Sequence, residues 1–150
     1  MSQTVWISRV DFVRLQHLIA VERRAARSPI LARRRWLSDE DTACLDALEK
    51  KLASARLGGP VSLPKDVITL NARGRLRDSA ANTVRDFTLV LPERADGRVG
   101  LISVLSPLGV ALIGSRTGEE IEFRTDEGET RVAVESVLYQ PEAAGDLHLW

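Results

Sequence analysis

The sequence has one cysteine, two histidines and few aromatic residues, and it contains no long apolar run. The single cysteine, Cys44, cannot form a disulfide within the chain, and its place in a helical apolar pattern favours inert packing. The histidines, His17 and His148, lie near opposite ends of the chain, which argues against a Cys/His metal site. No apolar stretch approaches the roughly 20 residues that cross a bilayer, and the first residues lack the pattern of a signal peptide. We therefore expect a cytoplasmic protein that contacts no membrane and holds no metal or cofactor.

The remaining composition is that of an ordinary globular protein. Its 150 residues, 44% hydrophobic and 28% charged, suffice for one substantial domain or a small domain with a helical appendage. The net charge is zero but unevenly spread, since residues 1–60 carry eleven Lys and Arg against seven Asp and Glu. Residues 61–150 carry ten against fourteen. The N-terminal part is thus the better candidate for contact with RNA or another acidic surface.

Two helical patterns occupy this N-terminal part. Ser8, with Asp11 three residues later, is a variant of the capping box before a helix over residues 9–27. Ser38 is a second helix start, followed by three acids, after which leucines recur at spacings of three and four. The spacing predicts an antiparallel coiled-coil hairpin over residues 1–59, ended by two glycines and a proline.

Beyond residue 60 the pattern changes from helical to strand-like. β-Branched or alternating runs, separated by turn signals, predict strands over residues 67–70, 83–91, 100–105, 119–125 and 130–139. A short helix is expected over residues 107–113, with Ser106 as its cap and Pro107 at its first position. Together these elements predict an α+β domain over residues 60–150.

Three sequence motifs carry a family resemblance. Leu101-Ile-Ser-Val-Leu-Ser-Pro-Leu-Gly-Val-Ala-Leu-Ile-Gly114 resembles the strand-to-helix signature of the GreA/GreB transcription elongation factors. Pro64-Lys-Asp-Val-Ile-Thr-Leu-Asn71 and Tyr139-Gln-Pro-Glu-Ala-Ala-Gly-Asp146 are similar to motifs of the Rnk family, a Gre-like group with a shortened helical hairpin. The resemblance covers residues 61–146 and implies an FKBP-like fold for the C-terminal domain.

The resemblance also implies a function. It points to a non-enzymatic transcription regulator that binds bacterial RNA polymerase at the secondary-channel entrance and competes there with GreA and GreB. It places the docking surface in the loop and helix start, at Ser103, Leu105, Ser106, Pro107, Leu108 and Gly109. The alternative is that serine and proline occur here because a strand-to-helix turn needs a cap and a fixed φ.

A second candidate function comes from the hairpin tip, where the Gre factors keep acidic residues that help hold a magnesium ion for cleavage of backtracked RNA. Asp39, Glu40 and Asp41 lie there, and their oxygens suit magnesium, although an acidic first turn also stabilises a helix. Helices of about 18 residues at ~1.5 Å rise make a projecting stalk of roughly 27 Å, whereas the Gre hairpins are nearly twice as long. We therefore expect no transcript cleavage and keep it as the alternative.

Arginines crowd the same end of the hairpin, among them Arg33, Arg34 and Arg35. They suit contact with nascent RNA or an acidic channel wall, or else form a solvated face offset by the neighbouring acids. We expect no specific DNA binding. The sequence assigns no role to the terminal His148-Leu149-Trp150.

An enzymatic function has little support. FKBP-like domains include prolyl isomerases, which need an aromatic-lined pocket, but the aromatic residues from 61 to 150 are only Phe87, Phe123, Tyr139 and Trp150. Gly58-Gly59 lacks the lysine and the spacing of a phosphate-binding loop. A further alternative is a protein-interaction module unrelated to polymerase.

Overall fold

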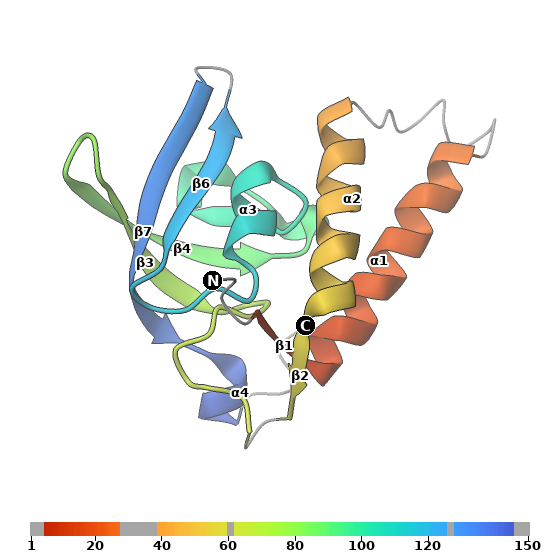
Figure 1. Cartoon of the computed structure of the whole chain (residues 1–150), viewed down its shortest axis with the longest axis horizontal. Helices are drawn as coiled ribbons and strands as arrows, with labels where there is room; N and C mark the ends of the chain where they lie inside the picture. Colours follow the sequence, from red (N-terminus) through yellow and green to blue (C-terminus); the bar gives the residue numbers. More distant parts are fainter. Residues whose placement is uncertain (1–4, 28–38, 60–61, 126–127, 146–150) are drawn as a thin grey trace.

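The computed structural model describes residues 5–27, 39–59, 62–125 and 128–145. A five-stranded sheet forms one side of the molecule, α3 lies against it, and α2 and then α1 follow beyond α3 (Figure 1). The helices are α1 (Arg9–Arg27), α2 (Asp39–Ser54), α3 (Pro107–Leu112) and α4 (Pro141–Ala144). The strands are β1 (Trp6–Ser8), β2 (Arg56–Gly58), β3 (Arg73–Asp78), β4 (Thr83–Val90), β5 (Leu101–Ser103), β6 (Glu120–Thr125) and β7 (Gly128–Tyr139).

The large sheet is mixed, with strand order β5-β4-β3-β7-β6. The central strand, β3, pairs antiparallel with β4 and β7, whereas β4 and β5 are parallel. Gly74 and Leu76 of β3 are buried, and its arginines alternate with them toward the opposite face. A Cβ on Gly74 would lie 2.7 Å from the ring of Phe87. Only glycine therefore allows the central strand to pass this close to that ring.

Most of the predicted strands are confirmed, and the α+β class with them. The observed strands β4, β5, β6 and β7 agree with the predicted runs to within two residues at each end, and α3 ends one residue early. The predicted strand over residues 67–70 is wrong, because these residues form a buried loop that an isolated bridge joins to Arg116. β3 was not predicted, since its charged residues hide the alternation around Leu76. The FKBP-like assignment stays a prediction.

The start of α1 is confirmed, and α2 begins at Asp39. The Oγ of Ser8 accepts a hydrogen bond from the backbone N–H of Asp11 at 3.1 Å, which caps α1. α2 ends at Ser54, earlier than predicted, and its continuation β2 pairs in parallel with β1. This two-stranded pair was not predicted. It joins the start of α1 to the chain that follows α2.

The two helices do not form the projecting stalk that the sequence suggested. The seam leucines Leu45, Leu48 and Leu52 are buried in the same core cluster as Leu112 of α3 and residues of the sheet. α1 and α2 diverge toward the ends that bear residues 27 and 39 (Figure 1). The apolar side of α2 thus packs along the globular part, because that contact buries the leucines more completely than α1 alone can. The domain boundary between residues 59 and 60 stays a prediction. Residues on both sides of this boundary belong to the same core cluster.

A lysine fixes α2 to α3. The Nζ of Lys51 donates hydrogen bonds to the backbone oxygens of Val110 at 2.7 Å and Ala111 at 3.0 Å. These carbonyls belong to the last turn of α3, whose oxygens lack partners within the helix. Burial lowers the pKa of Lys51 to about 8, and the nearby carboxylate of Glu119 opposes that shift. The side chain of Lys51, on α2, therefore caps the C-terminal end of α3.

An aspartate fixes α1 to the irregular segment between β2 and β3. Asp11 is 2% exposed, and its Oδ2 accepts a hydrogen bond from the backbone N–H of Leu70 at 2.9 Å. Burial raises the pKa of Asp11 to about 7, opposed by the Leu70 hydrogen bond and reinforced by the carboxylate of Glu142. This carboxyl group therefore keeps its proton to a higher pH than a free aspartate while it holds the buried loop in place.

Replacing Lys51 by Met should lower the free energy of unfolding by about 1–2 kcal/mol, because the oxygen of Val110 loses the Lys51 donor and that of Ala111 keeps only the hydroxyl of Ser115, while the aliphatic stem is kept. Urea denaturation at pH 7 measures the change. The matched control is Lys50→Met on the exposed side of α2, which should stay within about 0.5 kcal/mol of the wild type. Equal effects of the two substitutions would contradict a capping role for Lys51.

Asp11→Asn should remove a pH dependence from stability. Between pH 4 and 7 the unfolded chain has lost the Asp11 proton while the folded chain keeps it, so unfolding releases a proton. The wild type therefore loses stability as pH rises through this range, by about 1.4 kcal/mol per unit of pKa difference. The amide that replaces the carboxyl group still accepts a hydrogen bond from Leu70 but does not titrate. Urea denaturation from pH 4 to 8 should give a flatter profile for the variant, and parallel profiles would show that Asp11 is ionised throughout.

Candidate functional site

The loop between β5 and α3 is organised by two serines. The Oγ of Ser103 accepts a hydrogen bond from the backbone N–H of Leu105 at 3.0 Å. The Oγ of Ser106 donates to the backbone oxygen of Ser103 at 2.7 Å and accepts from the backbone N–H of Gly109 at 3.0 Å. Pro107 occupies the first turn of α3, where its missing N–H costs nothing. The loop is therefore rigid, and both serine hydroxyls are used within it.

Gly109 is required by the close approach of α3 to this loop. A Cβ on Gly109 would lie 1.8 Å from the backbone oxygen of Ser103, a distance that no side chain can occupy. Leu108 is also buried, in the core cluster. The internal contacts of Ser103 and Ser106 agree with the alternative of a strand-to-helix turn that needs a cap, and the docking role of the loop stays a prediction. Leu105 and Pro107 are half-buried, as are Ser103 and Ser106, and are the apolar side chains of the loop that a partner can reach.

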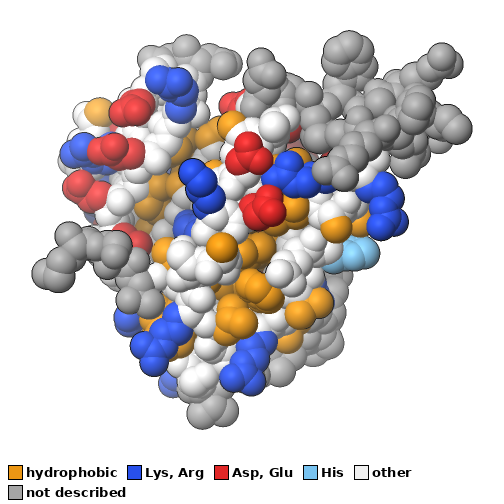
Figure 2. All heavy atoms as spheres, turned by 45° about the vertical axis from the view of Figure 1, so that its right-hand side comes forward, with side chains coloured by type: hydrophobic (Ala, Val, Ile, Leu, Met, Phe, Trp, Pro, Cys, Tyr) orange, Lys and Arg blue, Asp and Glu red, His pale blue; other side chains and the backbone are white. Residues whose placement is uncertain are grey.

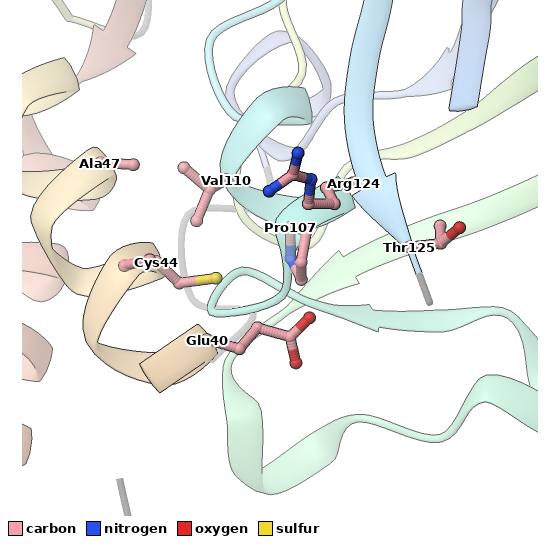
Figure 3. Close-up of a pocket in the computed structure, with 8 residues that line it drawn as sticks. Glu40, Cys44, Ala47, Pro107, Val110, Arg124 and Thr125 are labelled. Carbon is pink, nitrogen blue, oxygen red and sulfur yellow. The ribbon is translucent and has the colours of Figure 1, made fainter. Parts of the chain in front are cut away.

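A pocket of about 460 Å³ lies beside this loop, between α2, α3 and β6. Its walls are mainly apolar, with a carboxylate and a guanidinium at its rim, and Figure 3 shows the sulfur of Cys44 pointing into it. The lining residues are Glu40, Ala43, Cys44, Ala47, Pro107, Val110, Arg124 and Thr125. Pro107 thus belongs both to the candidate docking loop and to the pocket, so α2 forms part of the surface around that loop.

Of the acidic candidates at the start of α2, Glu40 is exposed and extends toward the pocket (Figure 3), and Asp41 is half-buried. The side chain of Asp39 lies outside the described part of the structure. Within the described ranges, no three His, Cys, Asp or Glu side chains lie close enough together to hold a metal ion. The arginine candidates Arg33, Arg34 and Arg35 lie outside the described residues.

The described arginines near this end are partly paired. An Nη of Arg23 on α1 contacts Oδ1 of Asp46 at 2.9 Å and Oε2 of Glu49 at 2.6 Å, both on α2. These carboxylates raise the pKa of Arg23. Arg23 therefore joins the two helices through Asp46 and Glu49, whereas the sequence alternative named the acids at residues 39–41 as the partners of the arginines, which stays a prediction.

The two Rnk-like motifs meet in space. The Nε2 of Gln140 donates to the backbone oxygens of Pro64 at 2.9 Å and Val67 at 2.8 Å. The Oγ1 of Thr69 donates to Oε1 of Glu142 at 2.7 Å. Gln140 is 4% exposed, so these contacts hold the buried loop from inside the domain. Sequence periodicity gave no sign of this pairing, because the partners lie more than seventy residues apart.

No helix in the described parts of the chain is long and apolar enough to span a membrane.

The fold and the loop define the class of protein. Residues 63–139 match the family model "Transcription elongation factor, GreA/GreB, C-term", which includes the loop from Ser103 to Gly109. The chain belongs to this family.

Particular relatives extend the match beyond the C-terminal region. The chain is 39% identical over 102 residues to the regulator of nucleoside diphosphate kinase of Escherichia coli K12, covering 67% of this chain and 75% of that protein. It is 30% identical over 148 residues to the elongation factor GreA of Chlorobaculum tepidum, covering 86% and 93%. A solved GreA/GreB factor from Nitrosomonas europaea superposes with a TM-score of 0.69 at 31% identity, covering 91% of this chain and all of that one. The resemblance to the Rnk and Gre families is confirmed.

Gly109→Ala should destabilise the protein by about 3 kcal/mol or more, because the added methyl group forces α3 away from Ser103. Thermal and urea denaturation measure the loss. Gly97→Ala is the matched control, since Gly97 has open space around its Cβ position. If both variants had the melting temperature of the wild type, the close contact at Gly109 would be ruled out.

Proposed function

We propose that the protein is a non-enzymatic transcription regulator that binds bacterial RNA polymerase at the entrance of the secondary channel. There it competes with GreA and GreB, so relative concentrations and affinities set its effect. The observation that carries this proposal is the family match over residues 63–139, which contains the rigid loop between β5 and α3. Members of this family are regulatory factors, and the relatives named GreA are transcription elongation factors.

The loop offers polymerase a small preformed surface. Its backbone is fixed by Ser103, Ser106 and Gly109, so little conformational entropy is lost on binding. Leu105, which also packs against the core cluster, and Pro107, which lines the pocket, present partly exposed apolar groups. A rigid apolar centre with polar groups at its rim is the arrangement that protein interfaces favour.

Transcript cleavage is the less supported alternative. A factor that delivers a magnesium ligand into the channel needs a projecting hairpin with outward acids. Here α2 is packed along α3, Lys51 fixes it there, and Glu40 extends toward the pocket. Occupying the entrance without reaching the catalytic centre therefore fits the geometry better. Contact with nascent RNA through Arg33, Arg34 and Arg35 is a further proposal that concerns residues outside the described ranges.

A competition assay tests the proposal. Purified protein is titrated against GreB-stimulated RNA cleavage on stalled elongation complexes, and we expect inhibition that excess GreB reverses. Leu105→Lys should weaken this inhibition about tenfold or more, since it places a charge in the apolar centre of the loop. Leu138→Lys is the matched control because Leu138 is an exposed leucine elsewhere, 45% exposed.

Two outcomes would contradict the proposal. Stimulation of cleavage by the protein alone would favour the acidic-residue mechanism. No effect on cleavage, together with no binding to core polymerase in a purified system, would favour an interaction module with a different partner. Circular dichroism of both variants shows that any loss of inhibition does not come from unfolding.

A further inference from the structure

Helix α1 is apolar on two opposite sides, and only one of them is used. Its inner side contributes Leu15 and Ile19 to the core. Its outer side carries Val10, Val13 and Val21, which are 43%, 65% and 42% exposed. We call this outer side, with His17 and Arg24 at the same helical spacing, the valine face.

The exposure of these valines is not scattered. Seven large hydrophobic side chains are exposed in the described parts of the chain, and three of them lie on this one helix face. Positions 10, 13, 17, 21 and 24 follow each other at spacings of three and four, which places them on one side of a helix. Figure 2 shows hydrophobic side chains on the face of the molecule that bears the helices, with Lys, Arg and acidic side chains around them. Exposed apolar side chains repeated along one helix face are typical of an interaction site.

The exposed charges that α1 itself carries on its outer side have one sign. α1 contains two acids, Asp11 and Glu22, and both are buried, at 2% and 5% exposed. Arg9 and Arg24 are exposed near the two ends of the face. The outer side of α1 therefore presents a valine ridge with positive charge at its ends and no exposed carboxylate of its own.

We propose that the valine face docks an acidic amphipathic helix of a partner protein. Apolar side chains of that helix pack between the valines in ridges-into-grooves fashion, and its carboxylates meet Arg9 and Arg24. The surface is separate from the loop at Ser103 to Gly109, because α2 lies between α1 and α3 (Figure 1). The inference therefore goes beyond the proposed function, and a partner can occupy the valine face while the loop is engaged.

Other occupants fit less well. A second copy in a two-fold antiparallel arrangement would bring Arg9 against Arg24 of its neighbour, and like charges would repel. A lipid surface calls for large interfacial side chains such as Trp, Phe or Leu, and the face supplies short valines. RNA phosphates gain nothing from an apolar centre.

Two synthetic helical peptides of about 18 residues test the proposal. Both carry leucine at the same apolar positions, and one has glutamate and the other lysine at the flanking positions. Fluorescence anisotropy with the full chain should show saturable, salt-sensitive binding of the glutamate peptide only. The triple variant Val10→Ala/Val13→Ala/Val21→Ala should weaken this binding about tenfold or more. Alanine raises helix propensity, so the variant should retain its fold, which its melting temperature checks.

Two further variants sharpen the test. Val84→Ala/Val99→Ala removes exposed valines elsewhere, at positions 48% and 68% exposed, and should leave peptide binding unchanged. Arg9→Glu/Arg24→Glu should reverse the preference toward the lysine peptide. Both results would support the charge assignment.

Several results would overturn the proposal. Equal binding of the two peptides, or binding that the triple alanine variant does not reduce, would remove the valine face as the docking site. Binding to vesicles of phosphatidylglycerol that depends on the three valines, without binding of the glutamate peptide, would assign the face to lipid. Concentration-dependent dimers in sedimentation that the triple variant abolishes, again without peptide binding, would assign it to a second copy. None of these results bears on competition with GreB, which depends on the loop.

Discussion

The packing of α2 against α3 is the contact on which the rest of the structure depends. Three leucines of α2 enter the core beside Leu112, and Lys51 satisfies two carbonyls at the end of α3. The apolar and the polar contacts both require the same register between the helices, so α2 cannot slide along α3 without losing both. This fixed register brings the first turns of α2 beside Pro107 and closes one side of the pocket. An element expected to project becomes a wall of the candidate docking surface.

Buried polar groups perform a second organising task. Between β2 and β3, residues 62–72 form no regular helix or strand, yet residues 67–70 are fully buried. Asp11 satisfies the N–H of Leu70 from one side, and Gln140 satisfies the oxygens of Pro64 and Val67 from the other. An irregular buried segment needs such partners because its backbone groups have no ladder to pair with. The Rnk-like motifs at residues 64–71 and 139–146 are in this respect two halves of one structural unit.

The candidate loop illustrates how structural and functional demands share the same residues. Ser103, Ser106 and Gly109 are explained by the cap and by the close approach of α3, without any partner. Their rigidity is nevertheless what a recognition loop requires, because it presents Leu105 and Pro107 in a fixed position. The proposed contact with polymerase accordingly depends on two half-buried apolar groups, and the other members of the motif position them.

The sequence by itself determined the elements whose signals are local. Ser8 and Ser106 as caps, Pro107 at the first turn of α3, and the alternating runs of β4, β6 and β7 all depend on neighbouring residues, and all are present. The family also followed from the sequence, since its motifs are contiguous. Tertiary structure alone decided β3, whose charged residues become a central strand only because Gly74 and Leu76 meet the core. It also decided where α2 packs, because leucines repeated on one helix face predict a packing partner but do not identify it. The α3 helix and the sheet supply that partner together with α1, since residues of all of them belong to one core cluster.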